Sequence, residues 1–243
     1  MLSLGSCVSF LPPASLHQDM IQNQHPIISD SLDDKAQLIY GNIDKLRSSY
    51  HHNGSPEMEK NKGYGFNIGY GYANQKQSAG ISFGYTTGNM FDKEDVEYGY
   101  STIVFRGSYA LDFHEDKWHG HILKLQGAAS KGSGRYQNLL AEEYPFRDEY
   151  NLAIPDGAWL WSIGYGSAFY YVPNDSHQVG LGMSFNHSTD FDNEGFRAEF
   201  FDLDLSYVYS QHYKVHIGGM LDGRLTPRAE TLYFGAGYQV FIR

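Results

Sequence analysis

Six charged residues stand in stretches that otherwise alternate between small and apolar side chains. They are Arg106, Lys124, Asp202, Asp204, Asp222 and Arg224. Carboxylates close to an imidazole such as His187 or His216 are the usual partners for general acid–base chemistry. The sequence places no Ser-His-Asp order, nucleotide-binding loop or zinc motif beside them. We therefore predict no catalytic residues, no cofactor and no metal site, and we expect these six residues to form a charge network.

The segments that carry these charges change character with a period of two residues. In residues 158–171, Trp, Ile, Tyr and Phe occupy every second position, and Ser, Gly and Ala occupy most of the positions between them. We call these two sets of alternate positions the two parities of a segment. The pattern recurs in about nine segments from residue 63 onward, and such alternation is typical of β-strands. The 27 Gly and 20 Tyr among 243 residues also differ from the composition of helical bundles. The sequence therefore predicts an all-β fold.

The small residues on the second parity decide which kind of β fold is expected. A soluble β-sandwich would turn Lys, Glu, Thr and Arg to water on that face, and a soluble sandwich binding protein is the alternative. Gly, Ser and Ala instead suit the crowded interior of a narrow closed barrel, with the apolar parity facing lipid. We predict an antiparallel transmembrane β-barrel of about ten strands, within a range of roughly eight to twelve. The net charge of −10 argues against nucleic acid as a partner.

The links between the alternating segments are short and long in turn. The short links are expected at 74–76, 113–117, 173–176 and 210–214, and the long ones at 87–97, 130–157, 187–198 and 225–231. Outer-membrane barrels have short periplasmic turns and long external loops. This asymmetry predicts that the C-terminus lies on the periplasmic side.

The part of the chain before residue 63 is the hardest to interpret. Single-chain bacterial barrels usually have an even number of strands, which predicts a further strand within residues 36–52. This segment alternates poorly, and Leu38, Ile39, Ile43 and Leu46 fit a helix about as well. We divide the chain into a leader, 1–35, that is disordered, helical or a remnant of a passenger or linker, and a barrel, 36–243. Residues 1–30 contain no clear signal peptide.

Folding the strands about the short links predicts neighbours for the six charges. A turn near 113–117 would set Arg106 opposite Lys124, and a turn at 210–214 would set Asp202 near Asp222 with Arg224 on the diagonal. A basic pair and an acidic cluster would then lie on different walls of the barrel. Such walls either give a pore its selectivity or form a salt-bridge network that plugs a narrow lumen, and the small size of the barrel favours the plug.

The arrangement resembles the C-terminal β-domain of bacterial autotransporters. The resemblance rests on GYGFNIGYGYANQKQSAGISFGYTTGNM, YGYSTIVFRGSYALD and WHGHILKLQGAASKGSGRY, and it covers roughly residues 36–243. It implies that IYGNIDKLRSS corresponds to the linker helix that threads the lumen in that family. The family usually has twelve strands and ends on an aromatic residue, whereas Phe241 is followed here by two further residues.

The resemblance implies a bacterial outer-membrane barrel that anchors or exports an N-terminal passenger. Its partners would be outer-membrane lipid, lipopolysaccharide and the barrel-assembly machinery, which would read a C-terminal signal formed by Tyr238, Val240 and Phe241. A standalone barrel acting as an adhesin or narrow porin through its long loops is the other membrane interpretation. The aromatic girdle facing lipid is expected at Tyr64, Tyr72, Trp159, Trp161, Tyr171, Phe201, Tyr209 and Tyr238.

Overall fold

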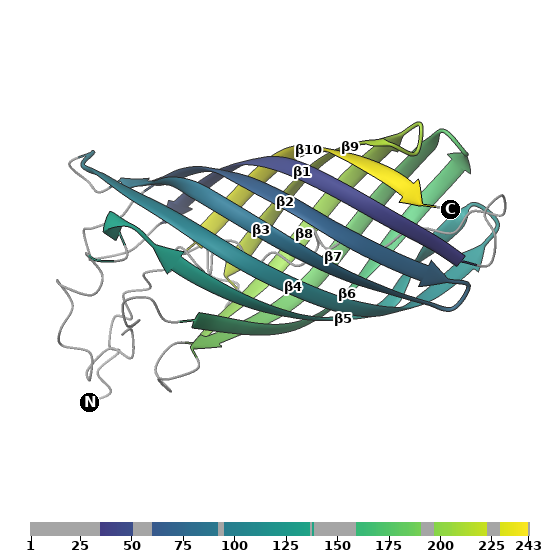
Figure 1. Ribbon diagram of the computed structural model, residues 1–243, viewed down its shortest axis with the longest axis horizontal. Coiled ribbons are helices and arrows are strands. Elements are labelled where there is room, and N and C mark those ends of the chain that lie inside the picture. Colours follow the sequence, from purple (N-terminus) through teal and green to yellow (C-terminus); the bar gives the residue numbers. More distant parts are fainter. Residues whose placement is uncertain are drawn as a thin grey trace, which may run out of the picture.

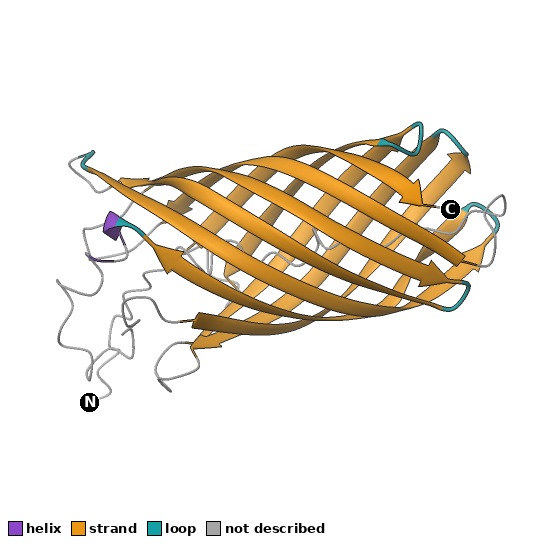
Figure 2. Ribbon diagram, in the orientation of Figure 1, coloured by secondary structure: helices purple, strands orange, loops and turns teal. Residues whose placement is uncertain are grey.

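A computed structural model describes residues 35–50, 60–91, 95–136, 138, 159–190, 197–222 and 229–242. Within these ranges the chain forms ten antiparallel strands, and the three residues Arg135, Tyr136 and Asn138 are helical (Figures 1 and 2). The strands are β1 Lys35–Tyr50, β2 Lys60–Asn74, β3 Gln77–Phe91, β4 Glu97–Glu115, β5 Trp118–Ser133, β6 Trp159–Asn174, β7 His177–Asp190, β8 Arg197–Tyr209, β9 Tyr213–Asp222 and β10 Ala229–Ile242. In this part of the chain no helix has the length and apolar character needed to span a membrane.

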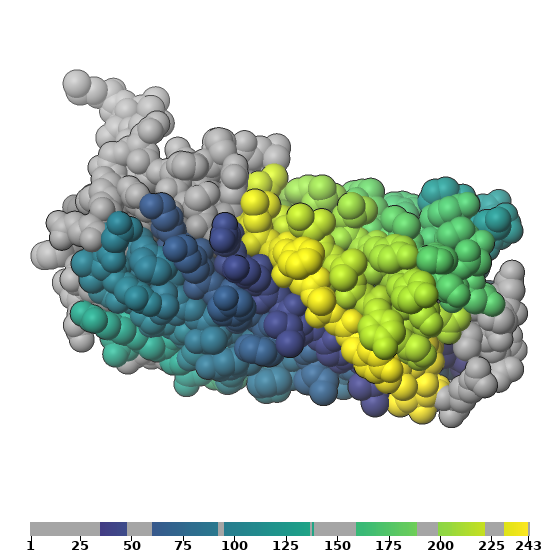
Figure 3. Space-filling model, turned by 90° about the horizontal axis from the view of Figure 1, so that it is seen from above, coloured from purple at the N-terminus to yellow at the C-terminus, as the bar shows by residue number. Residues whose placement is uncertain are grey.

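Each strand pairs with its neighbours in sequence, and β1 pairs with β10 to close the barrel. The closing register runs from Gln37 opposite Ile242 to Tyr50 opposite Ala229. Figure 3 shows the yellow band of β10 lying against the purple band of β1. The all-β barrel prediction is confirmed, and the β-sandwich alternative is wrong because one continuous sheet closes on itself.

Residues Lys35–Tyr50 form a strand, so the additional strand expected within 36–52 is confirmed. The helical interpretation of this segment, and the linker helix that the resemblance implied for IYGNIDKLRSS, are wrong. Leu38 and Leu46 point into the barrel, whereas Ile39 and Ile43 are exposed on the outside. The apolar residues of β1 are thus divided between the two faces, which explains their helix-like spacing. The expected leader lies outside the described residues, apart from Lys35, which begins β1.

Short turns join the strands at one end of the barrel. They lie at residues 75–76, 116–117, 175–176 and 210–212, and the C-terminus is at the same end (Figure 1). Ser210 and Gln211 both have positive φ, 53° and 61°, and the backbone N–H of His212 donates to the carbonyl of Tyr209. Two positive φ values at the centre of a hairpin are those of a type I′ turn, whose twist matches that of the strands it joins. The expected alternation of short and long links is present, since the longer segments join strands at the opposite end.

Burial alternates along the strands in the way the sequence pattern predicts. Outward apolar side chains are widely exposed, with Ile163 at 72% and Ile81 at 64%, while the inward residues between them are mostly buried. An exterior that exposes this many large apolar side chains cannot be stable in water but is suited to lipid. The inward polar and small residues form the core of the barrel together with buried apolar side chains such as Leu38, Tyr40 and Met90.

Candidate functional site

The lumen of the barrel is lined by polar side chains that water hardly reaches. Four of the six expected charges are buried there: Arg106 on β4, Lys124 on β5, and Asp202 and Asp204 on β8. Asp222 is the last residue of β9, but its side chain lies outside the described part, as does all of Arg224. The two basic residues and the two carboxylates thus come from different walls, with β6 and β7 between them.

The cross-strand neighbours of these charges differ from the expected ones. Arg106 lies opposite Ala128, and Lys124 lies opposite Ala110 and Gly166, so the predicted Arg106–Lys124 pairing is wrong. The hairpin turns at residues 116–117, at the far edge of the expected range, and a bulge after Leu111 shifts the register further. The two cations are thereby separated along the wall instead of facing each other.

The acidic side of the lumen shows a similar shift. Asp202 lies opposite Met220, and Asp222 lies opposite Phe200, so the two residues are diagonal neighbours and not a direct cross-strand pair. The turn occupies residues 210–212, shorter than the expected 210–214. Asp202 instead accepts hydrogen bonds from the side chains of Asn186 and Ser184 on β7.

A buried histidine–aspartate pair spans the closing strand. Nε2 of His216 on β9 lies 2.7 Å from Oδ1 of Asp44 on β1, with both side chains at 1% exposure or less. Gly235 on β10 is the cross-strand neighbour of both residues. A Cβ at this glycine would overlap Oδ1 of Asp44 and lie 2.6 Å from Nε2 of His216. The glycine therefore leaves the space through which the two side chains meet.

The same arrangement recurs on other walls of the barrel. The side-chain amide of Gln126 on β5 donates to Oδ1 of Asn186 on β7 at 2.7 Å, above Gly164 of β6. The guanidinium of Arg106, which lies opposite Ser82, reaches diagonally past Gly84 of β3 and donates to Oδ1 of Asn67 on β2 at 3.3 Å. A Cβ on either glycine would meet the side chains that cross it. Glycines in the lumen thus let polar groups two strands apart form hydrogen bonds.

Inward tyrosines use glycines in a second way. Four tyrosines each stand directly opposite a glycine of the neighbouring strand, and a Cβ there would meet the aromatic ring or its hydroxyl. The pairs are Tyr40–Gly69, Tyr100–Gly88, Tyr170–Gly180 and Tyr233–Gly218. The rings lie across the neighbouring strand in the space that the glycines leave.

Sequence reasoning missed the tyrosines and Asp44 as lumen residues, because it associated aromatic residues with the lipid face and assigned no clear parity to β1. Tyr170 and Tyr233 share the parity of the glycines in their own strands, and this was the available signal. Tyr40, Asp44 and Tyr100 lie on the opposite parity to the glycines of β1 and β4, so the pattern gave no such signal for them.

Near the short turns, a carboxylate connects three strands. Oδ1 of Asp112 accepts a hydrogen bond from the Ser78 hydroxyl at 3.0 Å and lies 2.6 Å from Nδ1 of His121. The ring of Tyr170 packs edge-on against His121, with ring centroids 5.7 Å apart. A nucleophile activated by histidine needs the imidazole between the hydroxyl and the carboxylate. Here the carboxylate is in the middle, an order that holds strands together but does not prepare Ser78 for attack.

At the loop end, a tyrosine that lies beyond the strands is buried. Tyr136 follows β5 and is fully buried, and burial raises the pKa of its phenol. The nearby Tyr100 hydroxyl donates to Oδ1 of Asn61 at 2.8 Å. No group of three or more His, Cys, Asp and Glu side chains in the described ranges is arranged to hold a metal ion.

The eight residues expected in the aromatic girdle lie on the outer parity of their strands at two levels. Those near the short turns are Tyr72, Tyr171, Tyr209 and Tyr238, and those nearer the loops are Tyr64, Trp159, Trp161 and Phe201. Around the turns, Trp118 packs on Tyr171 with ring centroids 4.9 Å apart, and Tyr213 packs on Tyr238 at 5.4 Å. Two aromatic levels enclosing an apolar band match the interfaces of a bilayer.

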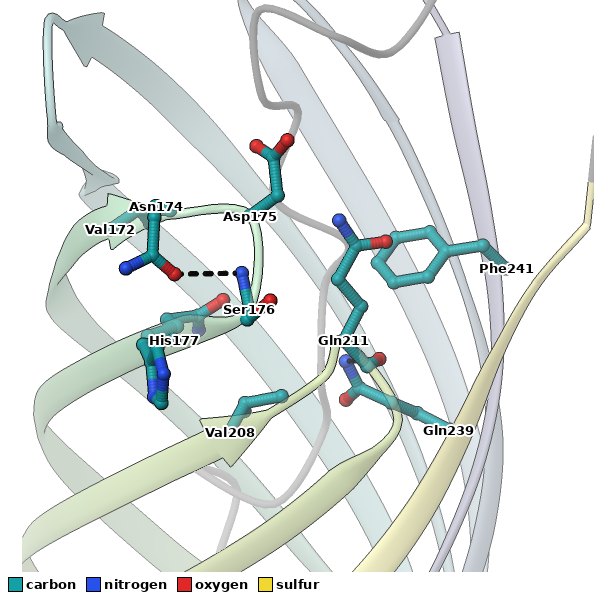
Figure 4. Close-up of a pocket in the computed structure, with 10 residues that line it drawn as sticks. Val172, Asn174, Asp175, Ser176, His177, Val208, Gln211, Gln239 and Phe241 are labelled. Atoms are coloured by element: carbon teal, nitrogen blue, oxygen red, sulfur yellow. Dashed lines mark hydrogen bonds between the residues drawn. The ribbon is translucent and has the colours of Figure 1, made fainter.

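The three residues of the expected C-terminal signal point in different directions. Tyr238 and Val240 are exposed on the outside of β10, whereas Phe241 has the inward parity opposite Leu38. Figure 4 shows Phe241 beside Gln211 in a recess between the short turns. The Gln239 side-chain amide donates to the carbonyl of Gln211 at 2.9 Å. The end of β10 is thereby attached to the β8–β9 turn at the mouth of the lumen.

No family model matches the sequence, and a comparison with curated proteins finds no match either. Solved structures do match. An outer-membrane channel from Pseudomonas putida F1 has 11% identity, covers 89% of this chain and 100% of its own, and gives a TM-score of 0.47. The β-domain of the Bordetella autotransporter BrkA has 11% identity, 85% and 99% coverage, and a TM-score of 0.44. The outer-membrane protease OmpT from Escherichia coli has 13% identity, 88% and 99% coverage, and a TM-score of 0.38.

The architecture of the chain follows from its own register and burial. The ten described strands form one closed sheet with an apolar exterior, two aromatic levels and a lumen lined by buried, mostly polar side chains. These are the features of a β-barrel that spans a membrane.

Proposed function

We propose that this chain is an integral protein of a bacterial outer membrane that anchors, and takes part in exporting, a passenger joined ahead of its first strand. The observation that carries the membrane assignment is the closed strand order combined with an outward face of exposed apolar residues. Closed antiparallel barrels of this kind belong to bacterial outer membranes, with their short turns on the periplasmic side. The passenger role rests on the resemblance of the strand sequences to autotransporter β-domains.

The filled lumen supports an anchor rather than a permanently open channel. Tyr40, Tyr100 and Tyr233 are at most 3% exposed, and the bridges over Gly84, Gly164 and Gly235 join the walls between them. Barrels of this strand number have interiors that side chains nearly fill. We infer that the polar lumen residues are structural and not catalytic, since the Asp112 carboxylate stands between Ser78 and His121.

The position of β1 sets a topological condition on the passenger. β1 begins at Lys35 on the short-turn side, the side of Asn74. A passenger ahead of Lys35 therefore reaches the loop side only by passing through the barrel. The C-terminal strand, with Tyr238, Val240 and Phe241, is our candidate for the segment that the barrel-assembly machinery reads.

The membrane assignment is tested by heat modifiability. The full chain, supplied with an export signal, is expressed in a bacterium with an outer membrane, and membrane samples are run unheated and boiled on SDS gels. We expect the unheated barrel to migrate differently from the boiled chain and to leave the membrane only with detergent. A chain that is extracted by urea alone and shows no shift would contradict the assignment.

The passenger role is tested by two tagged proteins. One carries an epitope between the export signal and residue 1, and its matched control carries the same epitope after Arg243. We expect antibody to label the first on intact cells and the second only after the outer membrane is permeabilised. If the amino-terminal epitope also requires permeabilisation while the barrel is heat-modifiable, the protein is a standalone barrel and the adhesin or narrow-porin interpretation replaces this one.

A further inference from the structure

Four cations gather on the outer face of two neighbouring strands at the loop end. Lys45 and Arg47 of β1 and Lys60 and Lys62 of β2 are all exposed. Arg47 lies directly opposite Lys62, and Lys45 lies opposite Tyr64, one outward position closer to the apolar band. We call these four residues the basic patch. They stand out in a protein whose formal net charge is −10.

The basic patch brings like charges together. Cross-strand neighbours have Cβ atoms about 5 Å apart, and like charges in such positions destabilise a sheet. Among the side chains that the structure describes, no carboxylate forms an ion pair with any of the four cations. Lys62 also lies over the ring of Phe91, with its Nζ 5.0 Å from the ring centroid. The arrangement is favourable once an anion lies between the strands.

The surroundings of the patch show what kind of anion fits. Directly towards the membrane centre lie the exposed side chains of Ile43, Phe66 and Phe234, at 46–59% exposure. Lys45 and Tyr64 mark the boundary between this apolar surface and the cations. A ligand that covers both regions carries negative charge on a head group and has an apolar body. That description fits a phosphate-bearing lipid.

We propose that the basic patch binds the phosphorylated head group of a lipid in the loop-side leaflet, with the acyl chains lying on Ile43, Phe66 and Phe234. If the barrel has the orientation proposed above, this leaflet is the outer one and the lipid is lipopolysaccharide, with its lipid A phosphates between Arg47 and Lys62. Basic residues at this depth attract anionic head groups, and the attraction falls as salt is raised. The proposal rests on the membrane assignment but not on a passenger.

The test uses the full chain, folded in a zwitterionic detergent, and a fluorescent Kdo2-lipid A whose binding is followed by anisotropy. The variant is Arg47→Gln/Lys62→Gln. Its matched control, Lys35→Gln/Lys76→Gln, removes the same charge from exposed residues at the short-turn end. We expect the patch variant to bind at least tenfold more weakly and the control to stay within twofold of the wild type. Lipid A lacking both phosphates should bind the wild type as weakly as Kdo2-lipid A binds the patch variant.

Three results would overturn the proposal. The patch variant binds within twofold of the wild type, the control loses as much affinity as the patch variant, or inorganic phosphate competes at the concentration at which the lipid binds. The last result would identify a free-anion site instead of a lipid site. Each variant is first shown to be heat-modifiable, so a failure to fold is recognised before binding is measured. If the wild type is not heat-modifiable, the membrane assignment is refuted. If the wild type is heat-modifiable but binds lipid A equally well with and without phosphates, only the proposed lipid site at the basic patch is refuted.

Discussion

His216 and Asp44, which come from β9 and β1, meet above a residue of the strand that separates them. Their side chains approach to 2.7 Å over Gly235, and each belongs to a strand at the seam of the barrel. The absence of a side chain at position 235 is therefore a requirement for a contact made by two other residues.

Gly235→Ala should destabilise the barrel. The added methyl group would overlap Asp44 and press on His216, so the buried pair must separate or the strands must shift. We expect a loss of roughly 2–4 kcal/mol in the free energy of unfolding, measured by urea unfolding in detergent or lipid. Gly107→Ala is the matched control, because a Cβ at Gly107 meets no heavy atom within 4 Å, and its effect should stay within about 0.5 kcal/mol. Equal losses in the two variants would refute the steric argument.

Asp44 and His216 should also show energetic coupling. Removing one member of a buried pair leaves the other without its partner. Asp44→Ala and His216→Ala should therefore each lower the free energy of unfolding by about 3–5 kcal/mol. The double variant should cost less than the two single losses together, by about 1–3 kcal/mol. The measurement is a double-mutant cycle in the same unfolding assay. Strict additivity would mean that the contact contributes nothing of its own.

Gly69 should tolerate a side chain only when Tyr40 is truncated. The Tyr40 ring lies where a Cβ of Gly69 would stand, and both positions face the lumen. Gly69→Ala should therefore cost roughly 1–3 kcal/mol in the wild type and under about 0.5 kcal/mol in a Tyr40→Ala background. Unfolding curves of the four proteins give both values. A similar cost in the two backgrounds would show that the ring is not what excludes the methyl group.

Tyr136 is expected to stabilise the folded barrel through the packing of its ring and not through its hydroxyl. The buried hydroxyl has no hydrogen-bond partner among the described residues, so Tyr136→Phe should be neutral or stabilising by up to about 1 kcal/mol. Tyr136→Ala should lose about 3–5 kcal/mol, because it empties the space that the ring fills. A substantial loss in the phenylalanine variant would reveal a bond made by the hydroxyl.

The same pair of proteins gives a dependence on pH. Burial raises the pKa of the Tyr136 phenol, so the folded state favours the neutral form. The contribution of this group is complete below the pKa of an unfolded tyrosine, about 10, and declines as the pH rises above it. Wild type should therefore lose stability relative to Tyr136→Phe above about pH 10. Unfolding curves at pH 8 and at pH 10.5 give the comparison, and a constant difference would contradict it.

The sequence allowed the strands to be predicted because each wall of the barrel has lipid on one side and the lumen on the other. Segments such as β6 and β7 obey this rule along most of their length, and their parity is visible without a structure. β1 obeys it less visibly, because Leu38, Tyr40 and Leu46 are apolar residues that face inward. These side chains pack inside the lumen. Because they are as apolar as the lipid-facing side chains, the hydropathy pattern does not distinguish the two groups.

The pairing of individual residues was beyond the reach of the pattern. Bulges after Leu111, between His121 and Lys124, and between Tyr171 and Asn174 each shift the register without changing which segments are strands. Turn centres depend on backbone conformations such as the positive φ of Asp116, which the sequence does not mark with a glycine. For this reason the strands that carry Arg106, Lys124, Asp202 and Asp204 could be predicted from the sequence, but the residues opposite them could not.

The pairing of the first strand with the last has a consequence for how the protein is made. β1 leaves the ribosome long before β10 exists, and until β10 arrives both strands next to the seam keep a row of unpaired backbone groups. Such edges recruit other chains. The nascent protein must therefore stay unfolded and protected until its last residues are synthesised, and a chain shortened by one strand would remain an open, adhesive sheet. Only a chain long enough to include both β1 and β10 can close the barrel.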